Sequence, residues 1–302
     1  MNVTKKMMSE AATLYYKKKL TQQEIADILN ISRQTVSKLI SDAVENKIVE
    51  IKIHDPDDDC REIEKKLCEK FNLNDAVVCS TSGENEVLRQ MQAVKSAIEY
   101  LTPLLKSGNK KIAISWGRTI EALISDLEPF ETENNIVYPL FGATDTDKPF
   151  FLPNELARNL ADKLCCKVKS AWFPYLPDSK TDCELFKNTS YYRSVKGLWG
   201  KADISIVGIG DTTVLKLFEK TFGSKKSTQV VGDIATHFFT KDGQFVPMYE
   251  NRLCASIDDL KSTQTTVAVA CGDKKATAIK GALKTGVIDV LITDEYTAKL
   301  II

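Results

Sequence analysis

Apolar residues in the first fifty positions recur at the spacing of two short amphipathic helices. The first helix is predicted to begin after Thr21, because Thr21 and Glu24 have the spacing of a capping box, and to end at Asn30. The second helix is predicted to begin after Ser32 as its N-cap. The two apolar faces comprise Ile25, Ala26, Ile28 and Leu29, then Val36, Leu39, Ile40, Ala43 and Val44. Two short helices about a tight turn indicate a helix-turn-helix.

Polar side chains gather at the start of the second helix, the part of a helix-turn-helix that enters the major groove of DNA. These DNA-binding candidates are Ser32, Arg33, Gln34, Thr35, Ser37 and Lys38. Arg33 and Gln34 can form paired hydrogen bonds with guanine and adenine edges, and the other side chains suit phosphates or thymine methyl groups. Double-stranded operator DNA is therefore the expected partner. The alternative for this segment is a docking module that binds no DNA.

The alternating pattern of Ile48–Ile53 predicts a strand, which would form the wing of a winged helix-turn-helix. The acidic segment after it contains Pro56, and we expect the domain boundary there, with a DNA-binding domain at 1–55 and an effector-binding and oligomerisation domain at 56–302. Apolar residues at 63, 67 and 71 predict a further amphipathic helix. That helix would serve either self-association or packing on its own domain.

Beyond residue 74 the chain alternates between strand-like and helix-like stretches, a pattern that is typical of α/β proteins with a parallel sheet. A helix is expected from about 84 to 106. The predicted strands are Ala76–Cys79, Lys111–Ser115, Ile136–Leu140, Ala171–Pro174, Asp203–Val207, Thr266–Ala270 and Asp289–Ile292. Ligands of such sheets bind at the carboxyl ends of the strands, so the loops at those ends are the candidate site.

Three of these loops carry binding chemistry. Gly117, Arg118 and Thr119 combine a close-approach glycine, a guanidinium and a hydroxyl at a helix start, which predicts a phosphate site. The loop with Gly208 and Gly210 resembles a dinucleotide fingerprint, but Thr213 stands where the third glycine belongs, so we expect no NAD and no other cofactor. The loop after residue 270 brings Lys274 or Lys275 to the same edge.

Composition narrows the class of protein. A length of 302 residues predicts about two domains. The chain has 41 basic and 41 acidic residues, which argues against binding of nucleic acid through the overall charge of the protein. Residues 1–54 alone carry nine basic and six acidic residues. We expect a cytoplasmic protein without a signal peptide or membrane span. Eight cysteines without a CxxC pair, and two histidines, predict buried reduced thiols and no metal site.

At these loops the chain resembles the SorC/DeoR-type sugar-binding transcriptional regulators, and the likeness extends almost from end to end. The matching stretches are 31–40, 115–119, 153–164, 202–210, 231–243 and 274–301. The resemblance implies a winged helix-turn-helix joined to a Rossmann-like α/β sugar-binding domain related to sugar-phosphate isomerases. It also implies a phosphorylated sugar as effector and a homo-oligomer, a tetramer or dimer of dimers.

Individual residues follow from the resemblance. The phosphate-binding loop of the family falls on Gly117, Arg118 and Thr119, and its ligand-facing lysine on Lys275. Asn154 and Glu155 match a pair at a helix start beside the sugar. Asp233 matches a position facing the ligand, although a role in capping a turn is the alternative.

Two positions depart from the family pattern. Phe141 stands where many relatives have glycine, and Cys271 replaces the first glycine of another pair. Phe141 would either narrow the sugar pocket or belong to the core.

Together these features favour a transcription regulator of carbohydrate metabolism, not an enzyme, whose binding to DNA a small phosphorylated sugar controls. One alternative is a sugar-phosphate isomerase or deaminase fused to a DNA-binding domain. Such chemistry needs a positioned base, and the candidates are His54, Asp145, Glu155, Asp211, Asp233 and His237. In a further alternative the large domain only oligomerises.

Overall fold

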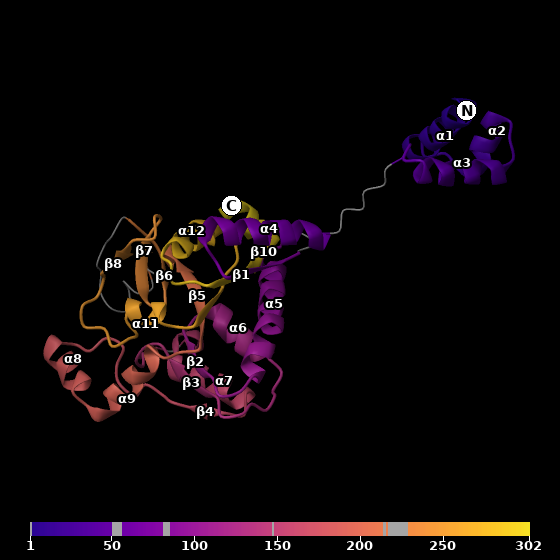
Figure 1. Cartoon of the computed structure of the whole chain (residues 1–302). Helices are drawn as coiled ribbons and strands as arrows, with labels where there is room; N and C mark the ends of the chain where they lie inside the picture. The colour runs from indigo at the N-terminus through magenta and orange to yellow at the C-terminus, as the bar shows by residue number, and fades with distance from the viewer. Residues whose placement is uncertain (1, 50–55, 81–84, 147, 214–215, 217–228) are drawn as a thin grey trace. The chain divides into compact units, whose positions relative to one another are not determined.

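The computed structural model describes residues 2–49, 56–80, 85–146, 148–213, 216 and 229–302 (Figure 1). The chain divides into two compact units, Met1–Asp55 and Pro56–Ile302. Each unit has a hydrophobic core of its own.

The small unit is a helix-turn-helix, as the sequence predicts. Its elements are α1 (Asn2–Ala12), the π-helical turn η1 (Thr13–Lys17), α2 (Gln22–Leu29) and α3 (Arg33–Glu45). The predicted capping box is present, because the Thr21 hydroxyl accepts a hydrogen bond from the Glu24 N–H and the Glu24 carboxylate accepts one from the Thr21 N–H. Asn30 ends α2 in the left-handed region, with φ of 52°, and Ser32 caps α3.

Parts of the small unit differ from the sequence predictions. The sequence reading did not anticipate α1, whose Met8, Ala11 and Ala12 belong to the small core. Ile28 is 59% exposed. The buried face of α2 consists of Ile25 and Ala26, and around the helix axis Ile28 lies on the side of Ile25 that faces away from Ala26. Val44 of the predicted second face is also exposed.

The predicted wing falls mainly on 50–53, which lie outside the described residues. Its first two residues, Ile48 and Val49, are described and form no strand. They pack instead against the small core.

A sheet with both parallel and antiparallel parts organises the large unit. Its parallel path has the order β1-β10-β9-β5-β2-β3-β4, with every neighbouring pair parallel. These strands are β1 (Asp75–Cys79), β2 (Lys111–Ile114), β3 (Ile136–Pro139), β4 (Lys167–Val168), β5 (Ile204–Asp211), β9 (Thr265–Val269) and β10 (Val290–Asp294). The α/β prediction is confirmed, and most predicted strands are found within one or two residues.

One predicted strand is wrong. Ala171–Pro174 forms no strand, and its only ladder contact is an isolated bridge between Pro174 and Ala143. The strand that pairs with the outer side of β3, at the edge of the sheet, is β4 instead. The side-chain amide of Asn154 binds the backbone of this segment at Ala171: it accepts a hydrogen bond from the Ala171 N–H at 2.7 Å and donates one to the Ala171 carbonyl at 3.2 Å. At Ala171, these side-chain hydrogen bonds stand in the place of strand pairing.

Helices cover the sheet in two layers (Figure 1). They are α4 (Pro56–Phe71), α5 (Glu86–Lys106), α6 (Arg118–Asp126), α7 (Pro153–Lys163), α12 (Ala276–Lys284) and α13 (Glu295–Ile301). The chain crosses the sheet in one direction from β1 to β4 and in the other from β5 to β10. Right-handed crossovers therefore place α5, α6 and α7 on one face and α12 on the opposite face. The strand order reverses between β2 and β5, which is where ligands of open α/β sheets bind.

An antiparallel extension follows the end of β5 and was not predicted. It contains β6 (Val230–Ile234), β7 (His237–Thr240) and β8 (Phe245–Val246). Its register pairs Gly210 with Asp233. Further helical elements in the described part of the chain are η2 (Pro149–Phe151), α8 (Lys180–Lys187), α9 (Ser190–Trp199), α11 (Ile257–Lys261) and η3 (Asp273–Lys275).

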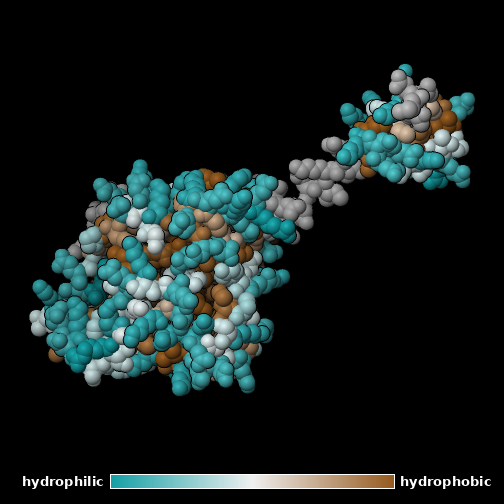
Figure 2. Space-filling model, in the orientation of Figure 1, coloured by the Kyte–Doolittle hydropathy of each residue, from teal (hydrophilic) through white to brown (hydrophobic). Residues whose placement is uncertain are grey.

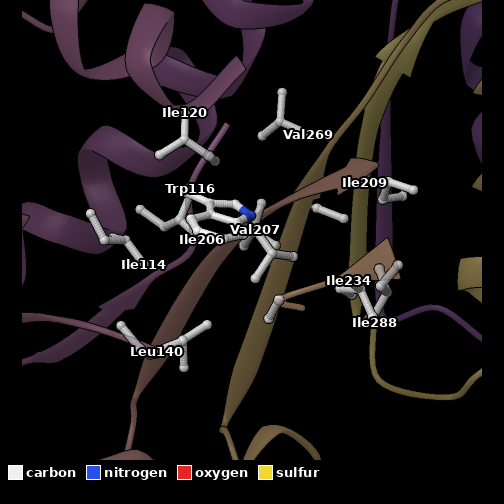
Figure 3. Close-up of a cluster of buried hydrophobic side chains, with 14 of the residues drawn as sticks. Ile114, Trp116, Ile120, Leu140, Ile206, Val207, Ile209, Ile234, Val269 and Ile288 are labelled. Carbon is white, nitrogen blue, oxygen red and sulfur yellow. The ribbon is translucent and has the colours of Figure 1, made fainter. Parts of the chain in front are cut away.

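The large core lies between the sheet and its helices. Figure 3 shows Trp116 beside Val207, with Ile114 and Ile120 close by. Ile63 and Leu67 of α4 are buried in this core, so the apolar face of that helix packs on its own domain and is not free for self-association. The surface of both units in Figure 2 is mainly hydrophilic. None of the described helices is long and apolar enough to cross a membrane.

The cysteines form no disulfide in the structure. Cys60, Cys79 and Cys183 are buried as expected, but Cys165 is exposed. Cys165 follows the end of α7 with φ of 47°, a turn conformation that keeps its side chain out of the core. The expectation of uniformly buried thiols is therefore wrong for Cys165.

Candidate functional site

A cavity of about 500 Å³ opens at the carboxyl ends of β2, β5 and β9, beside the point where the strand order reverses. Four basic and three acidic side chains face it among uncharged ones. The charged lining residues are Arg118, Lys148, Lys274 and Lys275, with Glu86, Asp211 and Asp233.

The loop that joins β2 to α6 lines one side of the cavity. Gly117 is the N-cap of α6 with φ of 122° and ψ of 160°, a conformation that is open essentially to glycine alone. No side chain caps this helix. The amides of its first turn are therefore open to an anion, and the helix dipole favours negative charge there. Thr119, on the same turn, also lines the cavity.

Aromatic side chains pack around this loop. The Arg118 guanidinium lies over the Phe150 ring, 5.1 Å from its centroid, and the Gly117 N–H donates to the Phe150 carbonyl at 2.8 Å. Trp116 lines the cavity and packs edge-on against Phe141, with ring centroids 4.5 Å apart. Phe141 itself is fully buried and absent from the cavity lining, so of its two predicted roles the structure favours the core.

The end of β5 forms the floor of the cavity. Gly208 and Gly210 line it, and the Gly208 N–H donates to the Ser115 hydroxyl at 3.2 Å, which ties β5 to β2. Asp211 lines it as well and accepts hydrogen bonds from the N–H and hydroxyl of Thr213.

Asp233 is a buried carboxylate in this cavity, only 4% exposed. It accepts a hydrogen bond from the Thr236 N–H at 3.2 Å, so it does cap the turn between β6 and β7 and also lines the cavity. Burial raises the pKa of Asp233 to about 6, against the opposing effects of the Thr236 hydrogen bond and the Lys275 charge. A carboxyl group with this pKa is partly protonated near neutral pH.

Two lysines come from the loop after β9. Lys274 is exposed, and the Lys275 ammonium donates to the Ile209 carbonyl at 3.1 Å. Arg89 of α5 binds this loop, and sequence reasoning missed it. Its side chain is 2% exposed and donates a hydrogen bond to the Asp273 carboxylate at 2.7 Å. Its guanidinium also lies 3.5 Å from the buried Asp294 carboxylate.

The structure brings together most, but not all, of the predicted effector residues. Gly117, Arg118, Thr119, Gly208, Gly210, Asp233 and Lys275 line one cavity. Asn154 and Glu155 do not line it. Asn154 is buried and holds Ala171, and Glu155 borders a separate hollow between α6 and α7.

Several lining residues had no distinct sequence signal. They are Glu86, Gln90, Lys148, Phe150 and Phe151. These residues come from α5 and from residues 148–151, whose distance in sequence hides their proximity to β2. Ser115 and Trp116 also line the cavity, and they belong to the matching stretch 115–119.

The structure also locates the residues considered as catalytic bases. His237 is buried, with Nε2 2.8 Å from the Ala255 carbonyl, and burial lowers its pKa to about 4. His54 lies outside the described residues. Asp145 is exposed and is not part of the cavity lining. Among the described residues, no group of three or more His, Cys, Asp or Glu side chains is arranged to hold a metal ion.

The small unit presents a second candidate site. Every predicted DNA-binding residue is exposed, namely Ser32, Arg33, Gln34, Thr35, Ser37 and Lys38. The intervening Val36 is fully buried and anchors α3 in the small core. The polar face at the start of α3 is therefore free to enter a groove of DNA.

Comparisons with known proteins agree with this geometry. Residues 55–302 match the family model described as "Putative sugar-binding domain", and residues 11–46 match "Sigma-70, region 4". The chain is 28% identical to the sorbitol operon regulator of Klebsiella pneumoniae, over 98% of both chains. It is 26% identical to the deoxyribonucleoside regulator of Bacillus subtilis, over 97% of this chain and 96% of that one.

A solved structure is similar over the whole length. The crystal structure of the full-length sorbitol operon regulator SorC from Klebsiella pneumoniae superimposes with a TM-score of 0.75 at 27% sequence identity. The match covers 98% of each chain.

Proposed function

This chain belongs to the sugar-binding domain family, and on that premise we propose that it is a transcription regulator of carbohydrate metabolism whose binding to operator DNA is controlled by a small phosphorylated sugar. The sugar operon and deoxyribonucleoside regulators among its relatives support the regulatory role. The exposed polar face of α3 supports binding to DNA.

The phosphate group of the proposed effector is inferred from one observation. The uncapped start of α6, with Gly117 at φ of 122°, opens onto the cavity beside Arg118 and Lys148. Backbone N–H groups, a helix dipole and a guanidinium together suit a phosphate group. The hydroxyl groups of a sugar would then face the carboxylates of Asp211 and Asp233 at the floor of the cavity.

The two units would be coupled through population shift. A ligand that binds one conformation of the large unit more tightly raises the population of that conformation, and DNA affinity changes with it. Helix-turn-helix regulators commonly bind two half-sites as dimers, so we expect the chain to act as a homo-oligomer, a tetramer or dimer of dimers.

The test of the effector is thermal unfolding of the full chain with pentose, hexose and hexitol phosphates and with their unphosphorylated parents. A ligand at 100 times its Kd adds about 2.7 kcal/mol to the free energy of unfolding. We expect a phosphate ester to raise Tm and its parent sugar to have little effect. Arg118→Ala should abolish the shift, whereas Lys95→Ala, at a 72% exposed position of α5, should retain it. No shift with any phosphate ester would contradict the proposal.

The test of DNA binding uses operator sequences selected from random duplexes by the full chain. Gln34→Ala and Arg33→Ala should each weaken operator binding by about 1–3 kcal/mol, the range for loss of a paired base contact. Ser41→Ala, at an exposed position farther along α3, is the matched control. Equal affinity of wild type, Gln34→Ala and Arg33→Ala would rule out α3 as the recognition helix.

Asp233 favours one second candidate function, a sugar-phosphate isomerase or deaminase. A carboxyl group with a pKa of about 6 in a ligand cavity is suited to proton transfer. Incubation of the stabilising phosphate ester with the protein distinguishes the two functions. Recovery of unchanged ester supports the regulator, and conversion that Asp233→Asn abolishes supports the enzyme.

A further inference from the structure

We infer that Arg89 is a positioning residue of the candidate effector site: it holds the loop Cys271–Lys275 against α5 and so sets how tightly an anionic ligand binds in the cavity. This inference rests on the proposed function and adds a residue that does not itself line the cavity. Arg89 acts through Asp273, the residue that directly precedes the two lysines of the loop.

The Arg89 guanidinium is a buried positive charge between two carboxylates. The side chain is 2% exposed. Its Nη2 donates to Asp273 Oδ1 at 2.7 Å, and its Nε lies 3.5 Å from Oδ1 of Asp294, which is fully buried. A buried guanidinium is unfavourable unless its anionic partners stay close to it, so this charge ties the two carboxylates together.

The polar contacts around Arg89 close into a ring. Asp294 caps α13, where it accepts hydrogen bonds from the Thr297 N–H at 3.0 Å and from the Thr297 hydroxyl. That hydroxyl in turn accepts a hydrogen bond from the Gly272 N–H at 2.8 Å. Because Gly272 directly precedes Asp273, the loop is bound twice, once through its backbone and once through a carboxylate.

This ring joins two walls of the cavity. One wall is the start of α5, where Glu86 and Gln90 line the cavity and Arg89 lies between them in the chain. The other wall is the loop after β9, and its lining residues are Cys271, Lys274 and Lys275. The two walls are close at Gly272, where a Cβ would lie 2.9 Å from Glu86 Oε1. Movement of the loop relative to α5 would therefore change the shape of the cavity.

Arg89 also determines the charge partner of Asp273. The Asp273 side chain is 47% exposed, and Arg89 binds it outside the cavity lining. Without Arg89, this carboxylate would be free to pair with Lys274 or Lys275 and would offset the positive charge that they offer to an anion. With the loop in its observed position, the Lys275 ammonium donates instead to the Ile209 carbonyl at the end of β5.

The contacts of Arg89 use the planar shape of the guanidinium as well as its charge. The Tyr296 ring covers it, with Cζ 4.6 Å from the ring centroid, while its N–H groups face Asp273 and Asp294. A lysine ammonium has the same charge but lacks the fork of N–H donors and the flat face. Arg89→Lys therefore separates the effect of geometry from the effect of charge.

The first test measures the position of the loop without any ligand, through the thiol of Cys271. This half-buried residue should react slowly with iodoacetamide in the wild-type protein. Asp273→Ala and Arg89→Lys both keep a positive charge at position 89, and each should raise the rate several-fold because the loop opens more often. Mass spectrometry follows the buried Cys183 as the internal control, whose rate should not change. Equal Cys271 rates in wild type and both variants would overturn the inference.

The second test is calorimetric titration of the full chain with ribose 5-phosphate, glucose 6-phosphate and glucitol 6-phosphate. Asp273→Ala and Arg89→Lys should each weaken binding by about tenfold, the effect of weakening one charge-assisted hydrogen bond to the ligand. Asp273→Ala should cause a much smaller further loss in Lys275→Met, because the lysine through which the loop acts is then already absent. Asp242→Ala, which removes a 64% exposed carboxylate from another ion pair, is the matched control and should bind like wild type.

The outcomes separate this inference from the proposed function. If Cys271 reacts faster in both variants but ligand affinity is unchanged, the inference is wrong and the proposed function stands. If the losses from Asp273→Ala and Lys275→Met simply add, Arg89 has only a structural role, and the inference is wrong as well. If no pentose, hexose or hexitol phosphate binds to the wild-type protein, the proposed function fails, and the Cys271 rates alone decide whether Arg89 holds the loop.

Discussion

Two buried ionisable residues of the large unit, Asp233 and His237, have pKa values shifted in opposite directions. Burial raises the pKa of Asp233 to about 6 and lowers the pKa of His237 to about 4. In both cases the uncharged form is favoured, because transfer of a charge from water into the protein interior is unfavourable. Each shift makes the free energy of unfolding depend on pH.

The two pH effects have opposite signs. The contribution of Asp233 is fully present below its unfolded pKa near 3.8 and is lost as pH rises through about 6. The contribution of His237 is present above its unfolded pKa near 6.5 and is lost as pH falls toward 4. Between pH 4 and 6 they partly cancel in the wild-type protein, so single substitutions are needed to see either one.

Asp233→Asn should remove the first contribution. Relative to wild type, the variant should gain stability as pH rises from 4 to 7, by on the order of 3 kcal/mol, since one pKa unit corresponds to about 1.36 kcal/mol. Urea unfolding at a series of pH values measures the difference. His237→Gln should show the reverse trend over pH 4 to 6.5. A difference between wild type and Asp233→Asn that is independent of pH would contradict the raised pKa.

At the scale of elements, helix starts are determined in two distinct ways. Thr21 and Ser32 cap α2 and α3 with side-chain oxygens, which satisfies backbone N–H groups and stabilises the helices. Gly117 begins α6 without a side-chain cap, in a backbone conformation that other residues rarely adopt. The capped starts therefore serve stability, and the start at Gly117 lines the candidate binding site.

Thr21→Ala should destabilise the small unit. Loss of the capping box should lower its free energy of unfolding by about 1 kcal/mol. The helical circular dichroism signal of the small unit during urea unfolding provides the measurement. Thr21→Ser keeps the hydroxyl and is the matched control. An unchanged midpoint in Thr21→Ala would mean that the capping box contributes no stability.

Gly117→Ala should combine a loss of stability with a loss of phosphate binding. Nothing lies within 4 Å of a Cβ at this position, so the cost of about 1–3 kcal/mol comes from the backbone conformation alone. Gly197→Ala in α9 is the control, because that position is equally open and helical, and alanine there should be neutral or stabilising. Thermal unfolding with and without phosphate ester measures both effects. Equal behaviour of the two variants would refute the role of Gly117.

At the scale of the whole molecule, the two cores share no residue. The small core is formed by α1, α2 and α3 with the residues that follow, and the large core by the sheet and its helices. The two units should therefore fold as separate bodies. In the proposed function, control of DNA binding would then depend on the proposed homo-oligomer and not on a common core.

A fragment of residues 56–302 should fold alone and keep the ligand-dependent Tm shift, because the candidate cavity is lined only by residues of that unit. The same fragment should lose operator binding, since α3 is absent. Thermal unfolding and an electrophoretic mobility shift measure the two properties. A fragment that unfolds cooperatively but has lost the ligand response would show that the small unit contributes to the effector site.

The sequence by itself determined the features that depend on neighbouring residues. The capping box of Thr21 and Glu24, the turn at Asn30, the strand periodicity and the loop at Gly117 all result from interactions within a few positions of the chain. Such interactions are encoded locally, so pattern and spacing reveal them. The helix-turn-helix, the parallel sheet and most of the candidate site were therefore predictable.

Only the tertiary structure decided which residues meet. Asn154 was expected at the ligand but holds Ala171, Ile28 was expected in the core but is exposed, and Arg89 had no sequence signal but supports the loop after β9. Burial and contact across elements depend on how distant segments pack, and a local pattern carries no record of that packing.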